Sequence, residues 1–278
     1  MTEKRKERSE DRLGRKYLTI LSGFIAAFLV ILILPYFLGR NFNFPDVELD
    51  RFQPIGGNLH VAMVRREFNP EQELMRLDIM IEDAMTSTRL SNLEFEAEVR
   101  YITGTRELSV DMRQISDHFI VIYIENLPQN FGVLSLNLTP YLIHPELHGG
   151  SNLASAGIRM YVNETPELFN YDLSKGDSID HRHDLLNVEE RFLWTAIEDK
   201  EEGIRQHNFS ISFLRDAIYR LQDEMFYMTL RERDEAYQMI MGHENAIANH
   251  ERNITDLQAE IVELEERILW LEERRLSI

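Results

Sequence analysis

The residues with the most obvious chemical potential are histidines, and their spacing argues against a metal site. The run HPELH at residues 144–148 places two imidazoles around one carboxylate. In the zincin pattern the glutamate follows the first histidine directly, and both histidines share one helix face. Pro145 stands in that place here and Gly149-Gly150 follow, which predicts a loop instead of a metal-binding helix.

A second histidine group, HRHD at residues 181–184, resembles a metal cluster only in composition. It stands just before a helical pattern, where Asp184 can cap the helix. His207, His243 and His250 fall at expected coiled-coil seam positions. A seam imidazole costs stability and repels a facing one when both are protonated. Two hypotheses follow for these three histidines. They set the register of the coiled coil, or their protonation loosens the coil below about pH 6.5.

Familiar catalytic motifs are absent from the sequence. It contains no G-x-S-x-G, no P-loop, no glycine-rich dinucleotide turn and no cysteine that could act as a nucleophile. Carboxylate pairs such as Asp177 and Asp180 lie in an acidic stretch without an inferable cleft. We therefore predict a non-enzymatic protein with no catalytic residue, no metal and no cofactor.

The helical region, residues 185–278, carries the strongest periodic signal of the chain. Isoleucine recurs at heptad position a and leucine at d, a combination that favours parallel two-stranded coiled coils. We expect this region to join two copies as a homodimer or to dock on another helical envelope protein. The oligomerisation seam is predicted at Ile211, Leu214, Ile218, Leu221, Ile254, Leu257, Ile261, Leu264, Ile268 and Leu271.

The heptad frame slips once along this region. Met225 and Ile240 are 15 residues apart, one more than two heptads. Local unwinding tolerates such a slip, and the segment lacks proline and is rich in helix formers. We therefore favour one continuous helix. The alternative is a helical hairpin that turns at Gly242 and Asn245.

Residues 57–165 show a period of two instead. The run LEFEAEVRY at residues 93–101 alternates strictly, and FIVIYI at 119–124 is apolar enough for a central strand. About seven such strands separated by turn signals predict an antiparallel β-sandwich of immunoglobulin or fibronectin-III type. We expect one linker at residues 39–56. A second, acidic linker is expected at residues 166–184.

The stretch from residue 17 to 38 holds 22 residues without a charge, enough for a helix to cross a bilayer. It lacks the small-residue cleavage site of a signal peptide. The preceding residues 1–16 are net +3, which predicts a cytoplasmic basic tail. The expected fold class is therefore a membrane-anchored α+β protein. It would lie in the cell membrane as a single-pass protein, with residues 17–38 in the lipid bilayer and the bulk extracytoplasmic.

Charge and cysteine content narrow the function further. The net charge is −18, so the chain lacks the excess of lysine and arginine that nucleic-acid binding requires. Without cysteine the folded part depends on its hydrophobic core. We predict a scaffolding or self-associating protein of the cell envelope. The alternatives are an accessory subunit of a larger envelope or secretion complex, and a membrane-tethered module whose sandwich loops bind a wall polymer or a protein.

Overall fold

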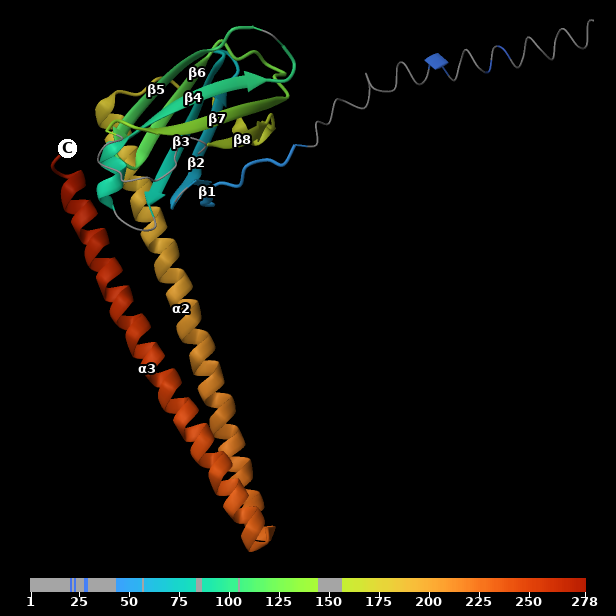
Figure 1. Cartoon of the computed structure of the whole chain (residues 1–278), viewed down its shortest axis with the longest axis vertical. Helices are drawn as coiled ribbons and strands as arrows, with labels where there is room; N and C mark the ends of the chain where they lie inside the picture. The colour runs from blue at the N-terminus through green and yellow to red at the C-terminus, as the bar shows by residue number, and fades with distance from the viewer. Residues whose placement is uncertain are drawn as a thin grey trace, which may run out of the picture. The chain divides into compact units, whose positions relative to one another are not determined.

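The computed structural model describes residues 44–56, 58–83, 87–104, 106–144 and 157–278, together with Leu21, Gly23, Phe28 and Leu29. The chain divides into two compact units, Met1–Ser174 and Lys175–Ile278. Figure 1 shows β-sheets in the first unit and a pair of long helices in the second.

The described part of the first unit contains eight strands, all paired antiparallel. The five-stranded sheet has the order β1-β2-β3-β6-β5 and the three-stranded sheet the order β4-β7-β8. Without the short edge strand β1, this is the ABED and CFG order of constant-type immunoglobulin domains. The strands are β1 (Gln53–Gly56), β2 (Leu59–Asn69), β3 (Leu74–Asp83), β4 (Leu93–Tyr101), β5 (Ser109–Ser116), β6 (Phe119–Glu125), β7 (Val133–Leu142) and β8 (Ile158–Asn163).

The core of this unit is formed by side chains from both sheets. In β4, Leu93 and Phe95 are buried while Glu94 and Glu96 are exposed, as alternation on a half-buried strand requires. Strand β6 lies between β3 and β5, and its run from Phe119 to Ile124 is buried throughout. Two short 3₁₀ turns, η1 (Ser87–Asn92) and η3 (Pro166–Leu168), complete the described elements.

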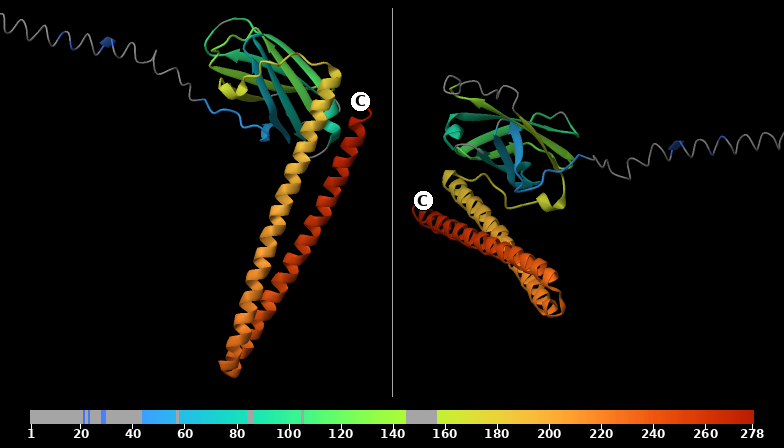
Figure 2. Two further views of the ribbon diagram at one scale, coloured as in Figure 1. Left: turned by 180° about the vertical axis from the view of Figure 1, so that it is seen from behind. Right: turned by 60° about the horizontal axis from the view of Figure 1, so that its bottom comes forward.

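The second unit is a helical hairpin. Helix α2 (Ser178–Glu224) is followed by a 3₁₀ turn, η4 (Met225–Tyr227), and by helix α3 (Leu230–Arg275). Figure 1 and the left view of Figure 2 show the two helices running alongside each other from the turn. At about 1.5 Å per residue, the 47 residues of α2 extend for roughly 70 Å.

The expected membrane-anchored fold class is wrong. Among the described residues, no helix combines the length and the apolar character needed to cross a bilayer. Helices α2 and α3 are long enough, but they carry charged residues throughout, which a bilayer core disfavours. The predicted single-pass signal anchor and the predicted cell-membrane location are wrong for the same reason. The expected span and bilayer contact at residues 17–38 lie outside the described residues except for Leu21, Gly23, Phe28 and Leu29.

The continuous helix is also wrong, because the chain reverses between Glu224 and Leu230. The hairpin alternative holds, but its turn is not at Gly242 and Asn245, which lie inside α3. The heptad frame slips because the helix ends there. Helix α2 begins at Ser178 with Asp177 as its N-cap, so Asp184 lies within the helix.

Candidate functional site

The predicted seam residues lie on the faces through which α2 and α3 pack. Ile211, Ile268 and Leu271 are buried, and the other seven residues are half-buried. Near the helix ends away from the turn, Leu186, Leu193 and Ile197 of α2 cluster with Ile268 and Leu271 of α3. The seam therefore has a partner within the same chain. Its role in joining two chains stays a prediction.

Polar contacts fix the antiparallel register of the hairpin along its length. Lys200 forms an ion pair with Glu260, and Arg215 Nη2 lies 3.2 Å from Glu251 Oε1. Arg275 Nη2 lies 2.6 Å from Glu190 Oε2, which ties the end of α3 to the beginning of α2. These exposed or partly exposed pairs contribute little energy each, but they define which residues face each other.

His207 and His250 meet across the seam. Their Nδ1 atoms lie 2.9 Å apart, and their ring centroids are 5.0 Å apart. A hydrogen bond between these atoms needs a proton on one nitrogen and a lone pair on the other, which two protonated rings cannot supply. The pair forms one polar layer within the chain, not between symmetry-related copies.

The turn between the helices is held by two local devices. Thr229 caps α3 as the first residue of a capping box, in which Glu232 accepts a hydrogen bond from the Thr229 backbone N–H at 2.7 Å. Hydrogen bonds from this N–H and the Thr229 hydroxyl lower the pKa of Glu232. Arg233 donates from Nε to the Met225 carbonyl at 3.0 Å, satisfying a carbonyl near the end of α2. The capping box and the Arg233 hydrogen bond therefore hold the backbone of the turn in a definite conformation.

The turn and the adjoining parts of α2 and α3 expose large apolar side chains. We call them the hairpin tip and define it as Tyr219, Phe226, Tyr227, Leu230, Tyr237 and Met241. The exposed fractions are 79% for Phe226, 86% for Tyr227 and 81% for Leu230. The rings of Phe226 and Tyr227 pack edge to face with centroids 5.2 Å apart. A hollow of about 570 Å³ lies beside them, lined by Met225, Phe226, Tyr237, Ile240, Met241 and the polar residues Gln222, Arg233 and Glu244.

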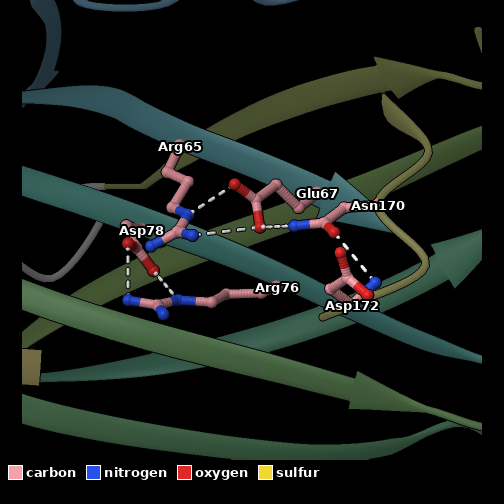
Figure 3. Close-up of polar contacts among 6 residues, drawn as sticks. All are labelled: Arg65, Glu67, Arg76, Asp78, Asn170 and Asp172. Atoms are coloured by element: carbon pink, nitrogen blue, oxygen red, sulfur yellow. Dashed lines mark hydrogen bonds and ion pairs between the residues drawn. The ribbon is translucent and has the colours of Figure 1, made fainter. Parts of the chain in front are cut away.

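A cluster of polar residues on β2 and β3 of the sandwich is a second site to consider (Figure 3). Arg76 and Asp78 form a buried bidentate pair with two contacts of 2.8 Å. Glu67 accepts hydrogen bonds from Arg65 Nε at 2.8 Å and from Asn170 Nδ2 at 2.9 Å. Because these carboxylates are engaged by protein donors, the cluster is suited to fixing the sheet and the segment after β8 instead of reacting with a substrate.

No metal-binding cluster of three or more His, Asp or Glu side chains occurs in the part of the chain that the structure describes. The HPELH run falls outside that part except for His144. His181 is buried at the start of α2, and His183 is half-buried there. Among the described residues, the strongest candidate site is the hairpin tip, because it groups the most exposed aromatic side chains beside a hollow.

Sequence reasoning missed this site although one signal for it was present. The sequence TLRE at residues 229–232 is a capping-box pattern, which marks the start of a new helix inside a long helical region. Placing the turn there would have brought Phe226, Tyr227 and Leu230 to the end of a hairpin. Their exposure has no periodic signature, so the apolar tip itself was not predictable from spacing.

Comparison with known proteins reveals similarity but no described function. Residues 52–174 match the family described as PXO2-05-like domain, a range that corresponds to the sandwich. An uncharacterized protein, pXO2-05 of Bacillus anthracis, is 29% identical over 232 residues, covering 83% of this chain and 81% of the relative. Residues 1–174 are too few to supply that coverage, so the similarity extends into the hairpin. No solved structure matches the chain.

Proposed function

We propose that this protein is a non-enzymatic scaffold that makes protein–protein contacts through its C-terminal helical hairpin. The observation that carries the proposal is the hairpin tip, where Phe226, Tyr227 and Leu230 are 79–86% exposed. Large apolar side chains grouped on a surface are characteristic of interaction sites. The seam is already occupied within the chain, and the tip combines highly exposed aromatic side chains with an adjacent hollow, which supports it as the surface for contact with another protein.

Photo-crosslinking in the cells that make the protein tests this function. A photoreactive amino acid replaces Tyr227 at the tip, and in a matched chain it replaces Tyr141, which is 45% exposed on the sandwich. We expect discrete protein adducts from position 227 and few from position 141. An adduct near twice the chain mass of 32.8 kDa indicates a second copy, and any other mass indicates a different partner.

The result that would contradict the proposal is also specific. If positions 227 and 141 give the same adducts in the same yield, the hairpin tip has no preferred protein contact. A scaffold acting through this surface is then excluded.

A further inference from the structure

We infer that the hairpin tip is a self-association surface through which two copies of this chain join end to end. This inference rests on the proposed function and names the partner, a second copy. The two-fold arrangement would place each tip against its equivalent, so one patch of residues serves both chains.

The exposed apolar area at the tip suits a dimer interface. Phe226, Tyr227, Tyr219 and Tyr237 are 79%, 86%, 69% and 58% exposed. With roughly 200 Å² for each aromatic side chain, these rings alone offer about 600 Å² per chain, against the approximately 800 Å² per partner of a standard interface. Leu230 and Met241 add to that area.

The tip carries a low net charge. Residues 219–241 carry three basic and five acidic side chains, whereas the whole of residues 184–278 is net −11. The other 72 residues of this range are net −9, so the negative charge is spread along the helices. Two copies packed side by side would bring these like charges together, but two tips meet where the net charge is only −2.

The tip is held in place before association. The Thr229 capping box and the bond from Arg233 to the Met225 carbonyl define the backbone that carries Phe226 and Tyr227. A surface that is already ordered loses less conformational entropy on binding. The adjacent hollow of about 570 Å³ provides room for an aromatic side chain of the second copy.

The test is sedimentation of purified full-length variants over a concentration series. The tip variant carries Phe226→Glu and Leu230→Glu, and the matched control carries Phe209→Glu and Phe213→Glu, two exposed positions along α2. We expect the tip variant to weaken dimerisation at least tenfold and the control to change it less than about twofold. All variants contain residues 17–38, so a difference between them reports on the substituted positions.

Circular dichroism checks that both variants keep their helices, as substitutions of exposed residues should allow. A wild-type chain that stays monomeric, or an equal effect of both variants, overturns the inference. If in that case Tyr227 crosslinks to a different protein in cells, the proposed function stands and only the second copy is wrong. If the tip neither supports dimerisation nor crosslinks to a protein in cells, the inference and the proposed function are both rejected.

Discussion

The sandwich encloses its core between two sheets, whereas the two helices of the hairpin share a single line of contact. Leu77 and Ile122 of the sandwich are fully buried, but most seam residues of the hairpin stay partly exposed. Among the described residues from 44 to 174, Tyr171 is the most exposed large hydrophobic side chain at 58%, against 86% for Tyr227 at the hairpin tip. Two helices packed along one line leave such side chains exposed, whereas two sheets enclose theirs.

The largest expected difference between the two units concerns buried and exposed phenylalanines. Phe68 is fully buried, with its ring centroid 5.4 Å from that of Phe131, so Phe68→Ala should cost about 3–5 kcal/mol of unfolding free energy. Phe213→Ala, at a 61% exposed position of α2, should change it by less than about 0.5 kcal/mol. Denaturant unfolding followed by circular dichroism measures both.

The tryptophans help to separate the unfolding of the hairpin from the unfolding of the sandwich. Both of them, Trp194 and Trp270, lie in the hairpin, so tryptophan fluorescence follows that unit. Equal losses for the two phenylalanine variants would mean that α2 buries Phe213 in solution and would contradict the contrast between the units.

A neighbouring pair of residues tests the seam itself. Ile268 is 5% exposed and Leu269 is 60% exposed. We expect Ile268→Ala to destabilise the hairpin by about 2–4 kcal/mol, and Leu269→Ala by less than about 0.5 kcal/mol. Tryptophan fluorescence during urea unfolding gives both values. A larger loss for Leu269→Ala than for Ile268→Ala would mean that the face of α3 that packs on α2 carries Leu269.

The turn is tested by removing its cap. Thr229→Ala deletes the hydroxyl that accepts from the Glu232 backbone N–H and should destabilise the hairpin by about 1 kcal/mol. Thr255→Ala inside α3 is the matched control, because its hydroxyl bonds only the Glu251 carbonyl one turn earlier. That change should be neutral or slightly stabilising, since alanine is the better helix former. Equal destabilisation would show that Thr229 is not a cap.

Gly242 distinguishes the observed turn from the one that the sequence suggested. It lies inside α3, and a Cβ added there would meet no atom within 4 Å, so Gly242→Ala should stabilise the hairpin by about 0.8–1 kcal/mol. Gly203→Ala should gain less, because its Cβ would lie 3.3 Å from Leu257 Cδ1. Thermal unfolding measures both. Destabilisation by Gly242→Ala would favour a turn at that residue.

The smallest effect concerns pH. Backbone hydrogen bonds from Asp180 and Ile179 lower the pKa of Asp177, and hydrogen bonds from the backbone N–H and the hydroxyl of Thr229 lower the pKa of Glu232. A carboxyl with a lowered folded-state pKa stabilises fully above its ordinary value, and this contribution disappears as the pH falls through the lowered value. Helix content should therefore decrease slightly below about pH 4. Glu232→Gln should reduce this acid-linked change, and an unaltered acid transition would contradict the assignment.

Local patterns in the sequence indicate the strands and one apolar face along the helices. Alternation in β4 and the apolar run in β6 reflect burial of individual side chains, which is a local property. A heptad pattern likewise identifies which helix face is buried. It does not say whether the partner helix belongs to the same chain, because Ile268 needs only an apolar neighbour.

The contacts between distant residues were not predictable in the same way. His207 and His250 meet only because the chain turns midway between them, and that turn was signalled by TLRE at residues 229–232, not by glycine. The expected membrane span rested on the composition of residues 17–38 alone, without a structural constraint from the rest of the chain.

The antiparallel return of α3 has a mechanical consequence. Arg275 contacts Asn187 and Glu190, so the C-terminal end of the hairpin lies beside its beginning. A force that pulls residues 175 and 278 apart would therefore unzip the seam one layer at a time, starting at the Leu186, Ile268 and Leu271 cluster. A force transmitted from the tip would instead load both helices along their axes in parallel and leave the seam unopened.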